Sequence, residues 1–390
     1  MRLFRILFLF LFSLVACSGN RLTPEDGLPL FRDDLDRESL HRAIYRSLEY
    51  LQRLPPDRVI GEWPRKLTAQ EVKESLLAFT EHLDLLDDPA SLFEALRSRF
   101  DLYESVSDQG HENNLFTGYY QPIIEASLIE TPTYRFPIYR RPDDLVEIDP
   151  TPFAPRLQGE KVVGRVDGNR LVPYFSRKEI DSLAQLKGKG YEIAWAKDPV
   201  QLFFLHIQGS GILRLEDGRL LPINYHASNG RPYTSIGKFL IGSGKVSEQD
   251  LSMQSLQRYL KEHPDERDAI FAQNESYVFF RFVEVGPLGS LEVPLTPGRS
   301  IATDARIFPK GALALIVSQK PVFDAAGNVS WQPFSRFVVN QDTGSAIRGP
   351  GRVDLYFGTG EQAGISAGVM KSSGRLFFLI KKTDHSQLQP

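Results

Sequence analysis

Two aspartates near the C-terminal end flank a loop rich in glycine and proline. Asp342 precedes this loop, and Asp354 follows it and leads directly into the aromatic run Leu-Tyr-Phe. A carboxyl group placed beside apolar strand residues has a raised pKa, because burial disfavours its charged form. An acid that donates a proton near neutral pH needs such a pKa. Aspartate also commonly caps turns, and the spacing alone favours that plainer interpretation.

A third aspartate, Asp304, lies within the glycine- and proline-bearing stretch 297–311 and fits a turn as well as a chemical role. The three aspartates are too far apart in sequence to form a calcium loop of closely spaced oxygen ligands. No two of the seven histidines have the spacing of a zinc site. The stretch 206–211 lacks the lysine of a phosphate-binding loop, and Ser210 lacks the elbow of a serine nucleophile. We therefore expect no metal and no cofactor.

Polar and aromatic residues interleave in three further stretches, 117–122, 134–141 and 225–233. Such surfaces suit sugars, because aromatic rings pack against the flat faces of sugars while amides and hydroxyls bind their rims. Each stretch taken alone is more often a matter of packing. The net charge of −3 is mild and evenly spread, so recognition of nucleic acid is not expected.

The N-terminal end reads as a secretory signal over residues 1–16, with Arg2 and Arg5 before an apolar run that is too short to span a bilayer. The following Cys17 is the only cysteine, so no intrachain disulfide can form. The sequence Leu-Val-Ala-Cys ending at Cys17 resembles the lipobox of bacterial lipoproteins, in which the cysteine receives a lipid. Ser18 resembles the pattern that directs lipoproteins to the outer membrane. An ordinary signal peptide with an incidental cysteine is the alternative.

The elements that must position these residues form two blocks. Residues 17–34 are polar and predict a tether. Apolar stripes at helical spacing predict three helices between residues 35 and 105, with a capping box at Thr68 and an N-cap at Asp88. From Phe116 short β-rich runs dominate, with helical stretches near 176–188 and 251–263. A length of 390 residues favours two folded units, and we expect a second β domain inserted into a first.

Five ordered segments resemble the membrane-bound lytic transglycosylase A family, the type of glycoside hydrolase family 102. The matching segments are 116–120, 206–211, 225–231, 298–304 and 342–360. The last two resemble the module named 3D after its three aspartates, here Asp304, Asp342 and Asp354. The resemblance extends from about Leu115 to Lys381.

This resemblance implies a mainly β fold with N-terminal helices. A double-psi β-barrel domain would comprise residues 35–122 and 246–390, and a smaller inserted β-barrel domain residues 123–245. Glycan would bind in the groove between the two domains. The resemblance makes Asp354 the catalytic residue, with Asp342 and Asp304 in support. It places five residues in the substrate groove: Thr117, Tyr119, Gln208, Ser210 and Lys238.

The implied reaction cleaves the bond between N-acetylmuramic acid and N-acetylglucosamine and leaves a 1,6-anhydro sugar, with one aspartate as both acid and base. Two alternatives stay open. One is a hydrolytic muramidase with Asp342 and Asp354 as a carboxylate pair. The other is a non-catalytic lipoprotein that binds peptidoglycan. The expected location is the periplasmic face of the outer membrane, reached through a lipid on Cys17. A monomer is the simplest expectation, and association with complexes of cell-wall synthesis or hydrolysis is left open.

Overall fold

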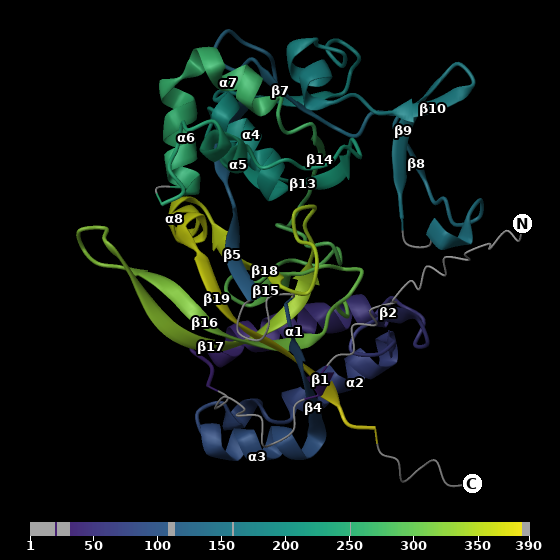
Figure 1. The fold of residues 1–390 in the computed structure, drawn as a ribbon, viewed down its shortest axis with the longest axis vertical. Coiled ribbons are helices and arrows are strands. Elements are labelled where there is room, and N and C mark those ends of the chain that lie inside the picture. The colour runs from purple at the N-terminus through teal and green to yellow at the C-terminus, as the bar shows by residue number, and fades with distance from the viewer. Residues whose placement is uncertain (1–19, 22–31, 108–113, 158–159, 250, 384–390) are drawn as a thin grey trace, which may run out of the picture.

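A closed barrel of six strands forms the lower half of the molecule in Figure 1. The computed structural model describes residues 20–21, 32–107, 114–157, 160–249 and 251–383, so Cys17 and the expected signal segment lie outside the described residues. The barrel strands are β5 (Asn114–Gln121), β15 (Ser300–Ala302), β16 (Leu313–Phe323), β17 (Val329–Asp342), β18 (Arg352–Thr359) and β19 (Lys371–Lys381).

Closure of the barrel depends on β5, which pairs with β18 on one side and with β19 on the other. The order is β19-β16-β17-β15-β18-β5 and returns to β19. The β15–β17 and β18–β5 pairs are parallel, and the other pairs are antiparallel. Two further strands, β4 (Phe100–Ser105) and β1 (Asn20–Arg21), continue the sheet beyond β19.

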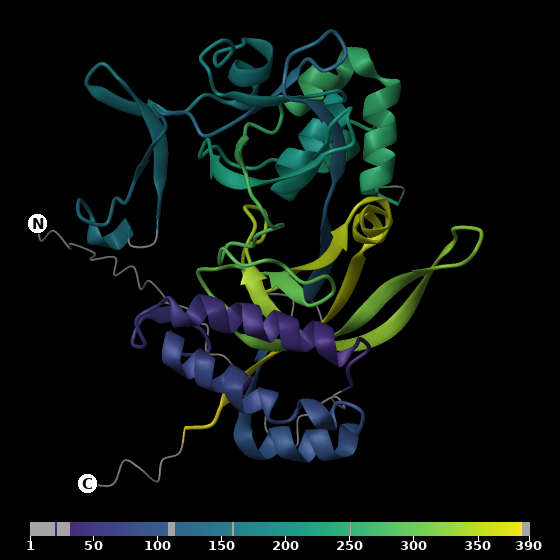
Figure 2. The same ribbon diagram turned by 180° about the vertical axis from the view of Figure 1, so that it is seen from behind.

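Three helices cover the outside of this barrel and lie together in the lower half of Figure 2. They are α1 (Arg37–Gln52), α2 (Ala69–Thr80) and α3 (Pro89–Arg99). The short strands β2 (Val59–Gly61) and β3 (Leu67–Thr68) lie between α1 and α2, and the 3₁₀ turn Leu83–Leu85 lies between α2 and α3. The expected capping box at Thr68 and the N-cap at Asp88 are both present. The apolar stripes face the barrel, where Phe79 of α2 packs against Phe337 of β17 with ring centroids 4.9 Å apart. All three expected helices are present, but the third ends at Arg99, and residues 100–105, which were expected to continue it, form β4 and pair with β19 instead.

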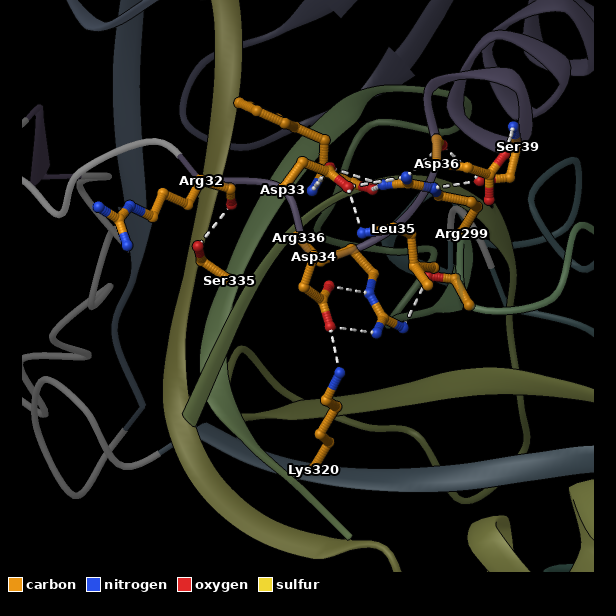
Figure 3. A network of polar contacts seen from close by, with 12 residues as sticks. Arg32, Asp33, Asp34, Leu35, Asp36, Ser39, Arg299, Lys320, Ser335 and Arg336 are labelled. Atoms are coloured by element: carbon orange, nitrogen blue, oxygen red, sulfur yellow. Dashed lines mark hydrogen bonds and ion pairs between the residues drawn. The ribbon is translucent and has the colours of Figure 1, made fainter. Parts of the chain in front are cut away.

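A buried ion-pair network fastens the segment before α1 to the barrel (Figure 3). The guanidinium of Arg299 donates to both carboxylate oxygens of Asp33, at 2.6 and 2.8 Å, and both side chains are almost completely buried. Next to it, Asp34 accepts from Arg336 at 2.6 and 2.7 Å and from Lys320 at 2.7 Å. Asp33 and Asp34, the last two residues of the expected tether, are therefore held against the barrel by paired charges, and the tether ends earlier than expected.

A second sheet forms the upper unit in Figure 1, with the order β14-β13-β12-β6-β11-β7. Its strands are β6 (Ile123–Ser127), β7 (Phe136–Tyr139), β11 (Glu192–Ala196), β12 (Ser210–Arg214), β13 (Leu220–Ser228) and β14 (Val278–Phe282). Four helices accompany it: α4 (Pro199–Gln208), α5 (Ile236–Gly242), α6 (Met253–Glu262) and α7 (Pro264–Phe271). A separate three-stranded sheet projects to one side: β8 (Val146–Ile148), β9 (Val162–Asp167) and β10 (Arg170–Pro173), with the 3₁₀ turn Pro155–Leu157.

The mainly β fold, with N-terminal helices and a barrel that carries an inserted β unit, agrees with the expectation. The second sheet, however, includes β14, which lies beyond residue 245, the expected end of the insertion. We propose that the inserted unit extends from Ile123 to Phe282. Apolar residues of α6 and α7 pack with those of α4, which places both helices in the same unit.

The sequence analysis did not predict four helices: α4, α5, α7 and α8 (Glu361–Val369). The first is nearly apolar all round, so it has no periodic stripe by which to tell it from a buried strand. The helical stretch expected over 176–188 is only a single π-helical turn, Lys178–Ser182. Within the described residues, no helix combines the length and apolar character needed to cross a membrane.

Candidate active site

Strand register brings Asp354, Asp342 and Thr117 to one level of the barrel. Asp354 of β18 lies opposite Ala302 of β15, and Ala302 in turn pairs with Asp342 of β17 after a register shift in β15. On its other side, Asp354 lies opposite Thr117 of β5. Neighbouring strands lie about 4.8 Å apart, so the Cα atoms of the two aspartates are separated by two strand spacings, roughly 10 Å. Register alone thus assembles residues that lie far apart in the sequence.

Asp354 is a carboxyl group poised to hold a proton. The hydroxyl of Thr117 donates to its Oδ1 atom. The pKa of Asp354 is raised to about 6, mainly by burial; the guanidinium of Arg352 opposes this rise, and the charge of Asp342 makes a smaller contribution in the same direction as burial. This is the range in which a group acts as an acid and then as a base close to neutral pH.

Asp342 is the second carboxyl group of the site and is held from three directions. Its Oδ2 atom accepts from the hydroxyl of Tyr119 at 2.9 Å, and its Oδ1 atom accepts from the backbone N–H groups of Ser290 at 2.9 Å and Thr343 at 2.8 Å. Burial nevertheless raises the pKa of Asp342 to about 6, although these hydrogen bonds favour its charged form. Its oxygens are therefore more fully occupied by the protein than those of Asp354.

Asp304 has different surroundings. Its buried carboxylate accepts from the side chain of Arg306 at 2.8 and 3.0 Å and from the N–H of Gly349 at 2.9 Å. Burial opposes ionisation, but the Arg306 guanidinium and the Gly349 N–H lower the pKa of Asp304 to about 2. A carboxyl with this pKa has no proton to give at neutral pH. These contacts make it an anchor for the glycine-rich loop that separates Asp342 from Asp354.

Comparison with known proteins agrees with this arrangement. Residues 115–281 match the family model described as the MltA specific insert domain, and residues 299–380 match the 3D domain. Membrane-bound lytic murein transglycosylase A of Escherichia coli K12 is 33% identical over 284 residues, which cover 72% of this chain and 69% of that protein. The chain belongs to the membrane-bound lytic murein transglycosylase A family. The protein of the same name from Vibrio cholerae is 31% identical over 271 residues, 68% of this chain and 65% of that protein.

Solved structures of the lytic murein transglycosylase A family share the whole fold. A membrane-bound lytic murein transglycosylase from Agrobacterium tumefaciens has a TM-score of 0.73 and 31% identity, covering 89% of this chain and 93% of that one. The Escherichia coli family member with bound chitohexaose has a TM-score of 0.72 and 26% identity, covering 94% of this chain and 95% of that one.

The residues expected to bind substrate lie on four elements. Thr117 and Tyr119 are two residues apart on β5, so they share a face of the strand, and each contacts one aspartate of the site. Gln208 ends α4 and accepts from the backbone N–H of Tyr120 at 2.9 Å, so it fastens the inserted unit to β5. Ser210 follows as a buried residue at the start of β12. Lys238 lies exposed on α5.

Sequence reasoning missed Arg352, and it included Tyr233 only as the last residue of the polar and aromatic stretch 225–233. Arg352 precedes Asp354 by two positions on the same strand, and its Nε atom is buried without a hydrogen-bond partner among the described residues. The pKa of Tyr233 is raised by burial and by the charge of Asp354, which places this ring close to the acid. Period-two spacing could have indicated Arg352, because residues i and i+2 of a strand share a face. In the described part of the chain, no group of three or more His, Cys, Asp or Glu could hold a metal ion.

Proposed function

We propose that this chain, a lytic transglycosylase of peptidoglycan, uses Asp354 as its single acid and base. The observation that carries the assignment is the partly buried carboxyl of Asp354, which accepts from Thr117 and whose pKa burial raises to about 6. Arg352, two residues earlier on the same strand, has a buried Nε atom without a hydrogen-bond partner among the described residues. The family relation supplies the reaction, and the chitohexaose held by the Escherichia coli relative supports a glycan as ligand.

The reaction begins with protonated Asp354, which donates to the glycosidic oxygen between N-acetylmuramic acid and N-acetylglucosamine. The C–O bond to the muramic sugar breaks, and that ring acquires oxocarbenium character. Asp354, now a carboxylate, takes the proton from the C6 hydroxyl of the same sugar, whose oxygen attacks C1. The product is a 1,6-anhydro sugar, and no water is consumed. An internal nucleophile gains its advantage from proximity.

The supporting residues orient Asp354 or stabilise the positive charge that develops on the muramic ring. Thr117 fixes one carboxylate oxygen of Asp354 and leaves the other for the substrate. Asp342, held by Tyr119, keeps a negative charge near the developing positive charge of the muramic ring and helps to raise the pKa of the acid. Asp304 holds the loop between them. Gln208, Ser210 and Lys238 belong to the inserted unit, which we propose forms the opposite wall of a glycan groove.

We further propose that the chain reaches its substrate as a lipoprotein. Relatives are named membrane-bound, and the sequence ending at Cys17 supports lipid attachment there. The lipid would anchor the protein to the periplasmic face of the outer membrane, and the residues between Cys17 and Asp33 would give it reach. The paired charges of Asp33 and Asp34 then mark where the tether meets the folded barrel.

The test is mass spectrometry of muropeptides that the full chain releases from purified sacculi, with Asp354→Asn alongside. We expect anhydro products, lighter by one water than their hydrolytic counterparts, and none with the variant. Reducing-end products would instead identify a muramidase with Asp342 as partner. Glycan binding without release by either protein would identify a non-catalytic binding lipoprotein.

A further inference from the structure

The inserted unit contains a cavity of about 320 Å³ that is separate from the aspartate site. It lies among β7, the π-helical turn, β11, α4 and α7, and none of its lining residues belongs to β5, β17 or β18. The volume is within the range of sites that bind small molecules. Nothing in the proposed reaction uses it.

The floor of this cavity is built around a buried cation. Arg177 lines the cavity and is only 2% exposed, with its guanidinium 4.8 Å from the ring centre of Phe203 and 5.0 Å from that of Tyr277. Its nitrogens also donate to the backbone carbonyls of Asn274 at 3.1 Å and Ser276 at 2.6 Å. These contacts fix the guanidinium, so the floor is rigid and carries a positive charge.

One carboxylate faces this cation and remains open to the cavity. Asp181 lies 3.5 Å from Arg177, yet 40% of its side-chain surface stays accessible. Burial raises the pKa of Asp181 against the opposing charge of Arg177, so the group is crowded by protein although a small molecule can reach it. A carboxylate in this position can accept hydrogen bonds from a ligand ammonium group.

The remainder of the lining offers charges of both signs. Arg135, Lys178 and Lys187 line the cavity, and none of them forms an ion pair within the described residues. Glu130, Glu192 and Asp268 also line the cavity, and of these three only Asp268 has an ion pair among the described residues, with Arg267. Aromatic surface from Trp195 and Phe203 lies between these charges. A ligand that carries several carboxylates and an ammonium group would neutralise both sets, whereas a neutral sugar would leave them unused.

We propose that this cavity binds the peptide side chains of peptidoglycan, a class of short peptide with free carboxylates and a free amine. The identity of the ligand rests on the proposed function, because peptidoglycan, the proposed substrate, carries such peptides on its muramic sugars. Helix α4 connects the two places: Pro199, Phe203 and His206 line the cavity, and Gln208 bonds to β5 beside Tyr119. Its length is about 15 Å at 1.5 Å per residue, which an extended peptide of four or five residues can span.

The binding test uses the full Asp354→Asn chain in detergent, so that turnover plays no part. A synthetic tetrapeptide, L-Ala–γ-D-Glu–meso-diaminopimelate–D-Ala, is titrated while the tryptophan emission is followed. We expect a saturable change that disappears in a Trp195→Phe background. The double variant Lys178→Glu, Lys187→Glu should weaken the affinity for the tetrapeptide about tenfold, because it reverses two charges that attract the ligand carboxylates. Isothermal titration calorimetry measures this affinity. Lys66→Glu, an exposed lysine of the barrel unit, is the matched control and should leave the affinity unchanged.

The activity test compares intact sacculi with glycan strands from which an amidase has removed the peptides. The double lysine variant should raise KM on the peptide-bearing substrate about tenfold and leave cleavage of bare glycan unchanged. Equal effects on both substrates, or no saturable binding of the tetrapeptide, would overturn the assignment. If the wild-type chain cleaves neither substrate yet binds the tetrapeptide, the proposed reaction fails while the peptide site stands.

Discussion

Three aspartates of similar sequence context acquire three different environments. The pKa values of Asp354 and Asp342 both rise to about 6 because burial penalises charge, whereas that of Asp304 falls to about 2 under the influence of Arg306 and Gly349. The two raised groups differ in their hydrogen bonds. Asp342 accepts from three donors, and Asp354 accepts from the hydroxyl of Thr117. The less occupied carboxyl is the better proton donor to a ligand.

The pH dependence of turnover should report the acid. Asp354 must enter the reaction protonated, and its pKa is about 6, so kcat should fall about tenfold per pH unit above that value. Initial rates of anhydro-product release between pH 4 and 8 measure the profile. A rate that stays constant between pH 4 and 8 would show that Asp354 is not the proton donor.

Substitution of Asp342 separates the two reaction types. The charge of Asp342 raises the pKa of Asp354, so Asp342→Asn should retain substantial activity and shift the inflection of the profile to lower pH. Loss of activity as complete as in Asp354→Asn would instead indicate an obligatory carboxylate pair.

The raised pKa of Asp354 also carries a stability cost. Between its unfolded value near 3.8 and its folded value of about 6, the folded chain binds a proton that the unfolded chain releases. Stability therefore falls as pH rises through this window and stays reduced above it. At pH 7.5 the free energy of unfolding of Asp354→Asn should be about 3 kcal/mol higher than that of the wild type. Denaturant titrations should show that this difference in the free energy of unfolding becomes small near pH 4. An equal difference at pH 4 and pH 7.5 would mean that the raised pKa of Asp354 is not its cause.

At the scale of elements, β5 is the strand on which the site depends. It pairs with β18 and β19, closes the barrel, and presents Thr117 and Tyr119 to the two aspartates. Between these residues, Gly118 has the helix α8 directly against it. A Cβ atom at Gly118 would lie 2.8 Å from the Cα of Ala367 and 2.7 Å from the ring of Phe357.

Gly118→Ala should therefore displace α8 or β5. We expect a loss of about 1–3 kcal/mol of stability, the usual cost of overpacking, and a lower kcat because both neighbours contact the aspartates. Thermal unfolding and initial rates measure the two effects. Gly242→Ala is the matched control, since nothing lies within 4 Å of its added Cβ. If Gly118→Ala and Gly242→Ala behave alike, the close packing of α8 on β5 is not what positions the site.

At the scale of the whole molecule, the last residues of the expected tether contribute to the stability of the barrel. Arg299 is completely buried and bonds to Asp33, to the hydroxyl of Ser39 and to the backbone carbonyl of Phe337 (Figure 3). A buried charge pair is costly to break from one side, because the remaining charge has no partner.

Arg299→Met should accordingly lower the free energy of unfolding by about 3–5 kcal/mol. Arg37→Ala supplies the comparison, because the ion pairs of Arg37 with Asp84 and Asp87 are exposed and such pairs contribute less than about 1 kcal/mol. Urea titration of both variants measures the difference. Losses of similar size would mean that the pair of Arg299 with Asp33 does not hold the segment in place.

The sequence by itself determined the local structure and the family. Capping residues such as Thr68 and Asp88 and the apolar stripes after them act within a few residues, so they specify α2 and α3 without knowledge of the fold. The 3D-like segment likewise identified Asp354 and Asp342 through ordered local motifs, and the β-rich character expected after Phe116 corresponds to strands such as β16 to β19.

Only the tertiary structure decided which residues meet and what their charges become. Register across β5, β18, β15 and β17 joins Thr117 to Asp354 and Asp354 to Asp342, over as many as 225 positions of sequence, from residue 117 to residue 342. Tyr233 lies in the loop between β13 and α5, so tertiary packing and not strand register brings it near Asp354. A pKa depends on burial and on neighbouring charges, which no local pattern contains, so the division into two poised acids and one permanent anion became visible only in the folded chain.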